Sequence, residues 1–232
     1  MLTTPARILT GNIAMPPPRA MNVGYRSVAW ELFGIGAATA VFLSSFEARP
    51  RYVDLVLAAV AVALIVASRA RSHRLWALVR APELDADRDA WRASLLFTGV
   101  ALIVLAGLAA LVARNAGTPA LDRFANWHLL AAAALYFLLA LLQQYIFQFY
   151  LLPRWLRLVP MPAAVALTAV TFSVVHFPRW PVMLATVFAG TVWALLYYRW
   201  RRLLPLALSH ALLGAALHYW VFGNDLLTRW LP

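Results

Sequence analysis

Long apolar runs separated by short charged segments dominate the chain. The runs with almost no charged residue are 27–46, 53–68, 93–113, 124–153, 158–178, 180–198 and 203–224. An α-helix rises 1.5 Å per residue, so about 20 residues cross the hydrocarbon core of a bilayer. The pattern therefore predicts an all-α fold, a polytopic membrane helical bundle of about seven transmembrane helices.

Several segments depart from a simple repeat of such helices. Residues 1–26 contain three consecutive prolines and no apolar core of a signal peptide, so we expect a disordered cytoplasmic tail before a single transmembrane domain at 27–224. Residues 81–90 are acidic, and we expect a solvated linker there. The 124–153 run is long for one crossing, so part of it should be tilted, interfacial or broken. Residues 178–181 predict a tight turn.

Composition supports the membrane assignment. Apolar residues make up 63% of the chain, charged residues 12%, and the mean hydropathy is +0.73. Soluble domains average about a quarter charged residues, so both a soluble domain and a disordered chain are excluded. There is no cysteine, so a disulfide scaffold is excluded too.

The basic residues are all arginine and give a net charge of +11. They lie singly or in short clusters beside the apolar runs, as membrane-flanking residues do, and we expect the lipid bilayer but no nucleic acid as a partner. Most of them fall on the inner side if the N-terminus is cytoplasmic. This predicts an integral protein of the bacterial inner membrane with its N-terminus inside and its C-terminus outside.

Polar side chains inside apolar runs are costly and therefore informative. Gln143, Gln144 and Gln148 lie within six residues of one run, and His176 and His210 lie in two others. Packing hydrogen bonds between helices would explain each of these residues alone. Because three helices contribute them, we also expect one shared polar site.

These residues form an ordered set of motifs. Residues 143–148 (QQYIFQ) are similar to the Glu-Glu-x-x-x-Arg segment of the CPBP family, the intramembrane proteases that include CAAX prenyl endopeptidases. Residues 172–176 (FSVVH) match that family's Phe-x-x-x-His motif, and residues 210–214 (HALLG) resemble its His-x-x-x-Asn motif. The resemblance covers a CPBP-like core at 124–222.

The resemblance implies a site and a cofactor. In the family the first Glu and the two His form the catalytic centre, described as a metal site or as a Glu-activated water. Zinc is therefore the possible cofactor, with His176 and His210 as its tentative ligands. The catalytic positions carried over are Gln143, Gln144, Gln148, His176 and His210.

The departures from the family motifs bear on the chemistry. Peptide hydrolysis needs a base, and a carboxamide accepts no proton at a useful pH. An amide oxygen is also a poor zinc ligand beside His, Cys or carboxylate. Gly214 lacks the polar side chain of the family's Asn. Either Glu31 or the His176–His210 pair would have to supply the base.

Two hypotheses follow. One is an intramembrane endopeptidase that cleaves a membrane-anchored or lipidated protein or peptide. The other is a pseudoprotease that binds such a segment without cleavage, in an immunity, chaperone or scaffold role. A haem protein and a transporter are further alternatives. With straight helices His176 would lie about 12 Å too far out to join the other residues, unless its helix starts late, after the prolines at 153–162.

Overall fold

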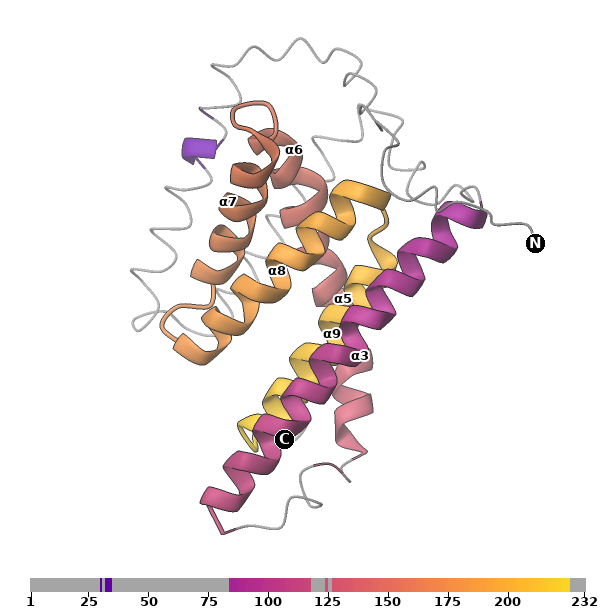
Figure 1. Ribbon diagram of the computed structural model, residues 1–232. Helices are drawn as coiled ribbons and strands as arrows, with labels where there is room; N and C mark the ends of the chain where they lie inside the picture. Colours follow the sequence, from indigo (N-terminus) through magenta and orange to yellow (C-terminus); the bar gives the residue numbers. More distant parts are fainter. Residues whose placement is uncertain (1–29, 31, 35–83, 118–123, 125–126, 226–232) are drawn as a thin grey trace, which may run out of the picture.

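The computed structural model describes residues 30, 32–34, 84–117, 124 and 127–225. The described part consists of helices: α3 (Leu84–Asn115), α5 (His128–Gln144), η2 (Tyr145–Leu151), α6 (Leu152–Trp155), α7 (Met161–Val174), α8 (Trp180–Trp200), α9 (Leu204–Ala216) and η3 (Leu217–Val221). α9 packs against both α5 and α3, and α7 packs against α8 (Figure 1). The all-α membrane bundle is confirmed over these residues.

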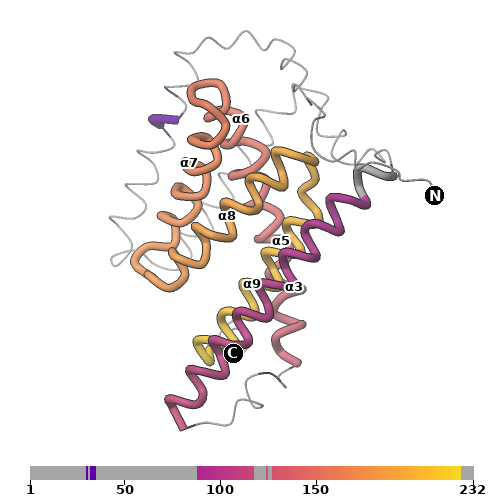
Figure 2. The backbone as a smooth tube through the Cα atoms, in the orientation of Figure 1, coloured from indigo at the N-terminus to yellow at the C-terminus, as the bar shows by residue number. Residues whose placement is uncertain are grey.

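Within the part of the chain that the structure describes, four helices are long and apolar enough to cross a membrane, namely Arg88–Asn115, His128–Trp155, Trp180–Trp200 and Leu204–Val221. They differ in how far the protein itself covers them. Only 11% of the α3 segment is buried, against 56% of the α9 segment. α3 therefore presents most of its surface outward, which suits contact with lipid, while α9, which runs beside it, is the most buried of the four (Figure 2).

Prolines set the starts of three helices. Pro162, Pro181 and Pro205 lie in the first turns of α7, α8 and α9. A proline fits there because the first helical N–H groups lack acceptors within the helix. α8 ends where Arg201 adopts a left-handed conformation, with φ of 57°.

Three expectations about segment boundaries need correction or refinement. Residues 84–90 are the first turns of α3 and not a linker, because the helix extends through the acidic segment. The predicted span 158–178 is only the short helix Met161–Val174. The long run 124–153 contains no loop between His128 and Trp155, but it changes from α- to π-helical winding at Tyr145. The predicted spans at 27–46 and 53–68, and the tail, lie largely or wholly outside the described residues.

A buried polar network joins three helices beside the centre of the bundle. The Ser94 hydroxyl of α3 donates to the carbonyl oxygen of Pro205 at 2.8 Å. The Thr98 hydroxyl and the Trp193 indole N–H both reach the Ser209 hydroxyl, at 2.7 and 3.0 Å. These contacts fix the rotation of α9 relative to α3 and α8.

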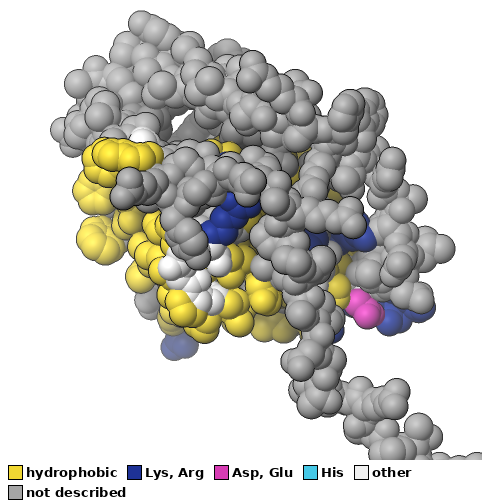
Figure 3. All heavy atoms as spheres, turned by 90° about the horizontal axis from the view of Figure 1, so that it is seen from above, with side chains coloured by type: hydrophobic (Ala, Val, Ile, Leu, Met, Phe, Trp, Pro, Cys, Tyr) yellow, Lys and Arg dark blue, Asp and Glu magenta, His cyan; other side chains and the backbone are white. Residues whose placement is uncertain are grey.

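Arginines gather at one end of the bundle, where α3 begins and where α6 and α8 end. They are Arg88, Arg92, Arg154, Arg157, Arg199, Arg201 and Arg202. Viewed from this end, arginine side chains lie beside a hydrophobic surface (Figure 3). The arrangement suits a charged rim at a membrane interface.

Candidate functional site

The site is built around the imidazole of His210, in the second turn of α9. His210 is only 3% exposed. Its ring lies 4.7 Å from that of Trp193, 5.3 Å from that of Phe172 and 5.4 Å from that of Tyr136, measured between centroids. Side chains from α5, α7 and α8 thus enclose a histidine whose own helix is held by Ser209.

Neutral partners engage both nitrogens of His210. The Gln144 amide nitrogen lies 3.4 Å from Nδ1, and the Tyr136 hydroxyl lies 3.2 Å from Nε2. That hydroxyl also donates to Gln143 Oε1 at 3.3 Å. All three hydrogen bonds are long, and the α5 residues that form them, Tyr136, Gln143 and Gln144, lie about two helical turns apart.

The direction of each bond follows from what its atoms can do. An amide nitrogen only donates, so Nδ1 of His210 accepts from Gln144. The single Tyr136 proton goes to Gln143 Oε1, which only accepts, so the hydroxyl oxygen accepts from His210 Nε2–H. The chain of bonds runs from Gln144 through His210 and Tyr136 to Gln143. It requires a neutral imidazole whose one ring lone pair is already used.

His176 lies in the turn that follows α7. Its Nδ1 donates to the carbonyl oxygen of Phe172 at 2.8 Å, which leaves the ring lone pair on Nε2. The His176 and His210 rings both contact the ring of Phe172, at 5.2 and 5.3 Å between centroids. α7 starts at Met161, within the proline-containing segment 153–162, three residues after the predicted start of the span.

Gln148 lies in the π-helical segment η2 and does not contact His210 by a hydrogen bond. It is 1% exposed, as is Gln144. The Oε1 atoms of both side chains are buried and have no hydrogen-bond partner. A buried carbonyl oxygen without a donor is unfavourable, and π-helical turns inside longer helices are frequent at functional sites. The two oxygens are acceptors that a ligand could use.

Tyr136 is a site residue that the sequence reasoning missed. It faces Gly214, where a Cβ atom would lie only 3.0 Å from Tyr136 Cε1. Glycine at this position therefore makes room for the tyrosine ring. The available signal was the spacing, because Tyr136 precedes Gln143 by two helical turns and so shares its face in an otherwise apolar segment.

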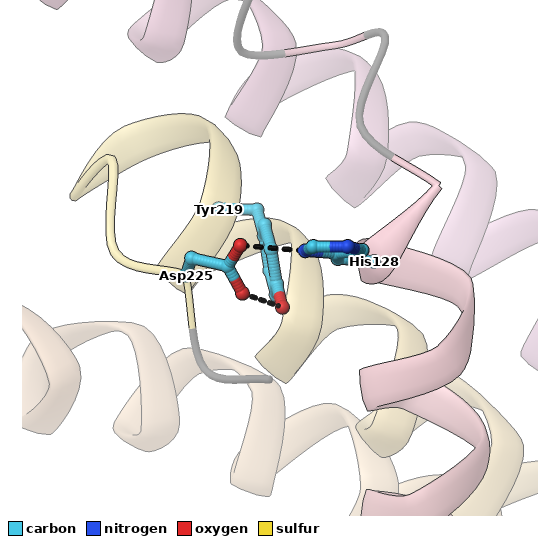
Figure 4. A network of polar contacts seen from close by, with 3 residues as sticks. All are labelled: His128, Tyr219 and Asp225. Carbon is cyan, nitrogen blue, oxygen red and sulfur yellow. Dashed lines mark hydrogen bonds and ion pairs between the residues drawn. The ribbon is translucent and has the colours of Figure 1, made fainter. Parts of the chain in front are cut away.

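No carboxylate lies at the site among the side chains that the structure describes. Asp89 is exposed on α3, 3.9 Å from Arg92. Asp225 binds His128 Nδ1 at 2.6 Å and accepts from the Tyr219 hydroxyl at 2.7 Å (Figure 4). His128 begins the helix that Gln144 ends, about 24 Å away along the axis. Glu31 lies outside the described residues.

The donor set does not fit the zinc site that the resemblance implies. Within the described residues no group of three His, Cys, Asp or Glu side chains could hold a metal ion. His210 has no lone pair to offer, because Nδ1 accepts from Gln144 and Nε2 carries the proton. His176 alone would remain, and zinc needs three or four such ligands.

Comparison with known proteins agrees with the motifs. Residues 124–216 match the family model of the Type II CAAX prenyl endopeptidase Rce1-like proteins. The matched range contains every predicted site residue as well as Tyr136 and Gly214, and it confirms the resemblance to the CPBP family for this segment. No curated protein and no solved structure matches the chain.

Proposed function

Residues 124–216 give this integral membrane protein a CAAX-protease-like intramembrane core, and from that premise we propose that it holds a membrane-embedded or lipidated peptide segment without cleaving it. Its role would be that of an immunity protein, chaperone or scaffold. We place it in the bacterial inner membrane with the arginine-rich end of the bundle in the cytoplasm, as the positive-inside rule favours. The N-terminus would be on the same side.

The neutral hydrogen-bond chain around His210 carries this proposal. A hydrolase needs a base that takes a proton from water in the transition state. Gln143 and Gln144 accept no proton, the His210 lone pair already accepts from Gln144, and His176 Nε2 is the one ring lone pair left at the site. A site of this kind keeps shape and hydrogen-bonding capacity while it lacks a carboxylate base among the described residues.

The unpartnered acceptors support a peptide as the ligand. Gln144 Oε1 and Gln148 Oε1 are buried carbonyl oxygens that need hydrogen-bond donors. A peptide backbone offers one N–H per residue, and an apolar chain or lipid group would suit the surrounding aromatic and aliphatic side chains. A strongly charged ligand would find no counter-charge among the described residues of the site.

The test is binding and cleavage measured on one sample. The purified protein in lipid vesicles is mixed with a fluorescent peptide that ends in a prenylated Cys-aliphatic-aliphatic-X sequence, and with the same peptide unprenylated. We expect saturable binding of the prenylated peptide and no shortened product by mass spectrometry. Absence of binding would contradict the proposal.

A shortened product would contradict the proposal as well, provided that it comes from this site. The His210→Ala variant supplies the control, because a contaminating protease would cleave equally in its presence. A product that the natural chain makes and that His210→Ala does not make would establish an active endopeptidase.

A further inference from the structure

The Tyr136 hydroxyl lies between Gln143 and His210, two positions that the family resemblance assigns to the catalytic centre. It is 3.3 Å from Gln143 Oε1 and 3.2 Å from His210 Nε2. A water molecule held by the same two atoms would have similar distances to each. One oxygen atom fits between them, and here it belongs to the protein.

The backbone of α9 is shaped to admit the tyrosine. A Cβ atom on Gly214 would lie 3.0, 3.5 and 3.8 Å from three carbon atoms of the Tyr136 ring. The ring also meets the His210 imidazole edge-on, at an interplanar angle of 89°. Gly214 follows His210 by one helical turn, so the two residues form one surface for the ring.

We propose that the Tyr136 hydroxyl fills the position of a hydrolytic water in this site and that Gly214 provides the space for its ring. The inference rests on the proposed non-cleaving function and gives it a second, independent cause. The glutamines remove the base, and the tyrosine removes the nucleophile. A carboxylate restored at residue 143 would then accept the Tyr136 hydrogen bond and still find no water.

The consequence concerns the reaction that a restored site would run. In peptide hydrolysis the water oxygen bonds to the carbonyl carbon and a carboxylate takes the water proton. The proton then passes to the amide nitrogen as the C–N bond breaks. The first step needs a water molecule beside the carboxylate, so restoring activity requires the carboxylates at 143 and 144 and the removal of Tyr136.

The experiment compares three variants for cleavage of the prenylated peptide. They are the double variant Gln143→Glu with Gln144→Glu, that double variant with Tyr136→Ala, and the double variant with Tyr198→Ala as the matched loss of a tyrosine elsewhere. We expect cleavage only when Tyr136 is removed, faster by on the order of a hundredfold. Cleavage by the double variant alone at the same rate would overturn the inference, as would a folded and inactive Tyr136→Ala combination.

A second measurement applies if the combined variant unfolds. In Tyr136→Ala alone, p-cresol and toluene are added and the melting temperature is recorded, because an apolar cavity of this kind binds small aromatics. We expect p-cresol to raise Tm by several degrees more than toluene, since only its hydroxyl reaches Gln143 and His210. Equal shifts would show that the hydroxyl position is not specific and would overturn the inference.

These outcomes are distinguishable from failure of the proposed function. Cleavage by the natural chain that disappears in His210→Ala would refute the non-cleaving function. The p-cresol measurement tests the role of Tyr136 even if the prenylated peptide does not belong to the class of the natural ligand, because p-cresol binding needs no peptide.

Discussion

Buried amides and one tyrosine give this site its character. Gln143 and Gln144 take part in a bonded chain with Tyr136 and His210, while the Oε1 atoms of Gln144 and Gln148 have no hydrogen-bond partner. Gln143 and Gln148, five residues apart, therefore differ in their effect on stability, because the Gln143 oxygen accepts a hydrogen bond and the Gln148 oxygen does not. Substituting each residue measures this difference.

Replacing Gln148 by Leu should stabilise the free protein. The change removes a buried carbonyl oxygen that lacks a donor, and such groups cost about 1–3 kcal/mol. Gln143→Leu is the matched control and should destabilise, because it leaves the Tyr136 hydroxyl without its acceptor. Denaturant or thermal unfolding in one detergent measures both changes. If Gln148→Leu destabilises as much as Gln143→Leu, its oxygen is not an unsatisfied group.

The Tyr136–Gly214 pair predicts a non-additive effect. Gly214→Asn should destabilise by about 1–3 kcal/mol, because the new side chain overlaps the tyrosine ring. Tyr136→Ala in the same chain should relieve most of that penalty, which a double-mutant cycle measures directly. The control is Gly107→Asn on α3, where a Cβ atom would meet nothing within 4 Å. Additive penalties at 136 and 214 would argue against the packing described here.

Helices show what the sequence could and could not predict. Polar residues in apolar runs marked Gln143, His176 and His210 without any structure, because burial of such groups has to be compensated. Helix ends were less predictable. The apolar run continues beyond α7 on both sides, so hydropathy alone does not mark where the helix starts or stops, and only the prolines at 160 and 162 indicate its start.

The partners of the site residues were also beyond sequence reasoning. Tyr136 and Ser209 are ordinary constituents of membrane helices, and their roles depend on how helices rotate about their axes. The sequence pattern predicts which face of each helix is polar but not which faces of neighbouring helices meet. The change to π-helical winding at Tyr145 also changes which direction the residues after it face.

Ser209 should matter more than other hydroxyls at similar depth. It accepts from the Trp193 indole N–H and donates to Thr98 Oγ1, whose own proton goes to the Ser94 carbonyl oxygen at 2.7 Å, so Ser209→Ala leaves the buried Trp193 donor without its acceptor. We expect a loss of about 1–3 kcal/mol in unfolding free energy. Thr171→Ala is the control, since that hydroxyl bonds only within its own helix, to the carbonyl oxygen of Leu167, and should cost less than 1 kcal/mol, roughly. Equal losses would mean that the network does not join the helices.

Two clusters of polar contacts lie at different depths along the helix bundle. The His210 chain lies inside the bundle, and the His128–Asp225–Tyr219 cluster ties the start of α5 to the segment after η3. The His128 and Asp225 side chains are both 27% exposed, so water competes less for their hydrogen bond than it would at a fully exposed pair. The cluster closes the end of the bundle opposite the arginine-rich rim.

Asp225→Ala should therefore lower stability measurably. We expect a loss of about 1–2 kcal/mol, because His128 and Tyr219 both lose a bond. Asp89→Ala removes an exposed partner of Arg92 at 3.9 Å and should change stability by less than about 0.5 kcal/mol. Thermal unfolding of the two variants under one condition decides the point. A larger effect at Asp89 would contradict this account of the bundle end.

The central claim is that the natural chain binds its membrane partner and does not cut it. The most direct measurement is quantitative mapping of the C-terminal peptides of membrane proteins in the source cell. Cells with the natural gene, cells with a deletion, and deletion cells that express the His176→Ala variant are compared. With the protein present at normal level, we predict no difference in C-terminal peptides among the three. A cleavage product found only with the natural gene, and lost in both other strains, would show that the site hydrolyses peptides and would contradict the account.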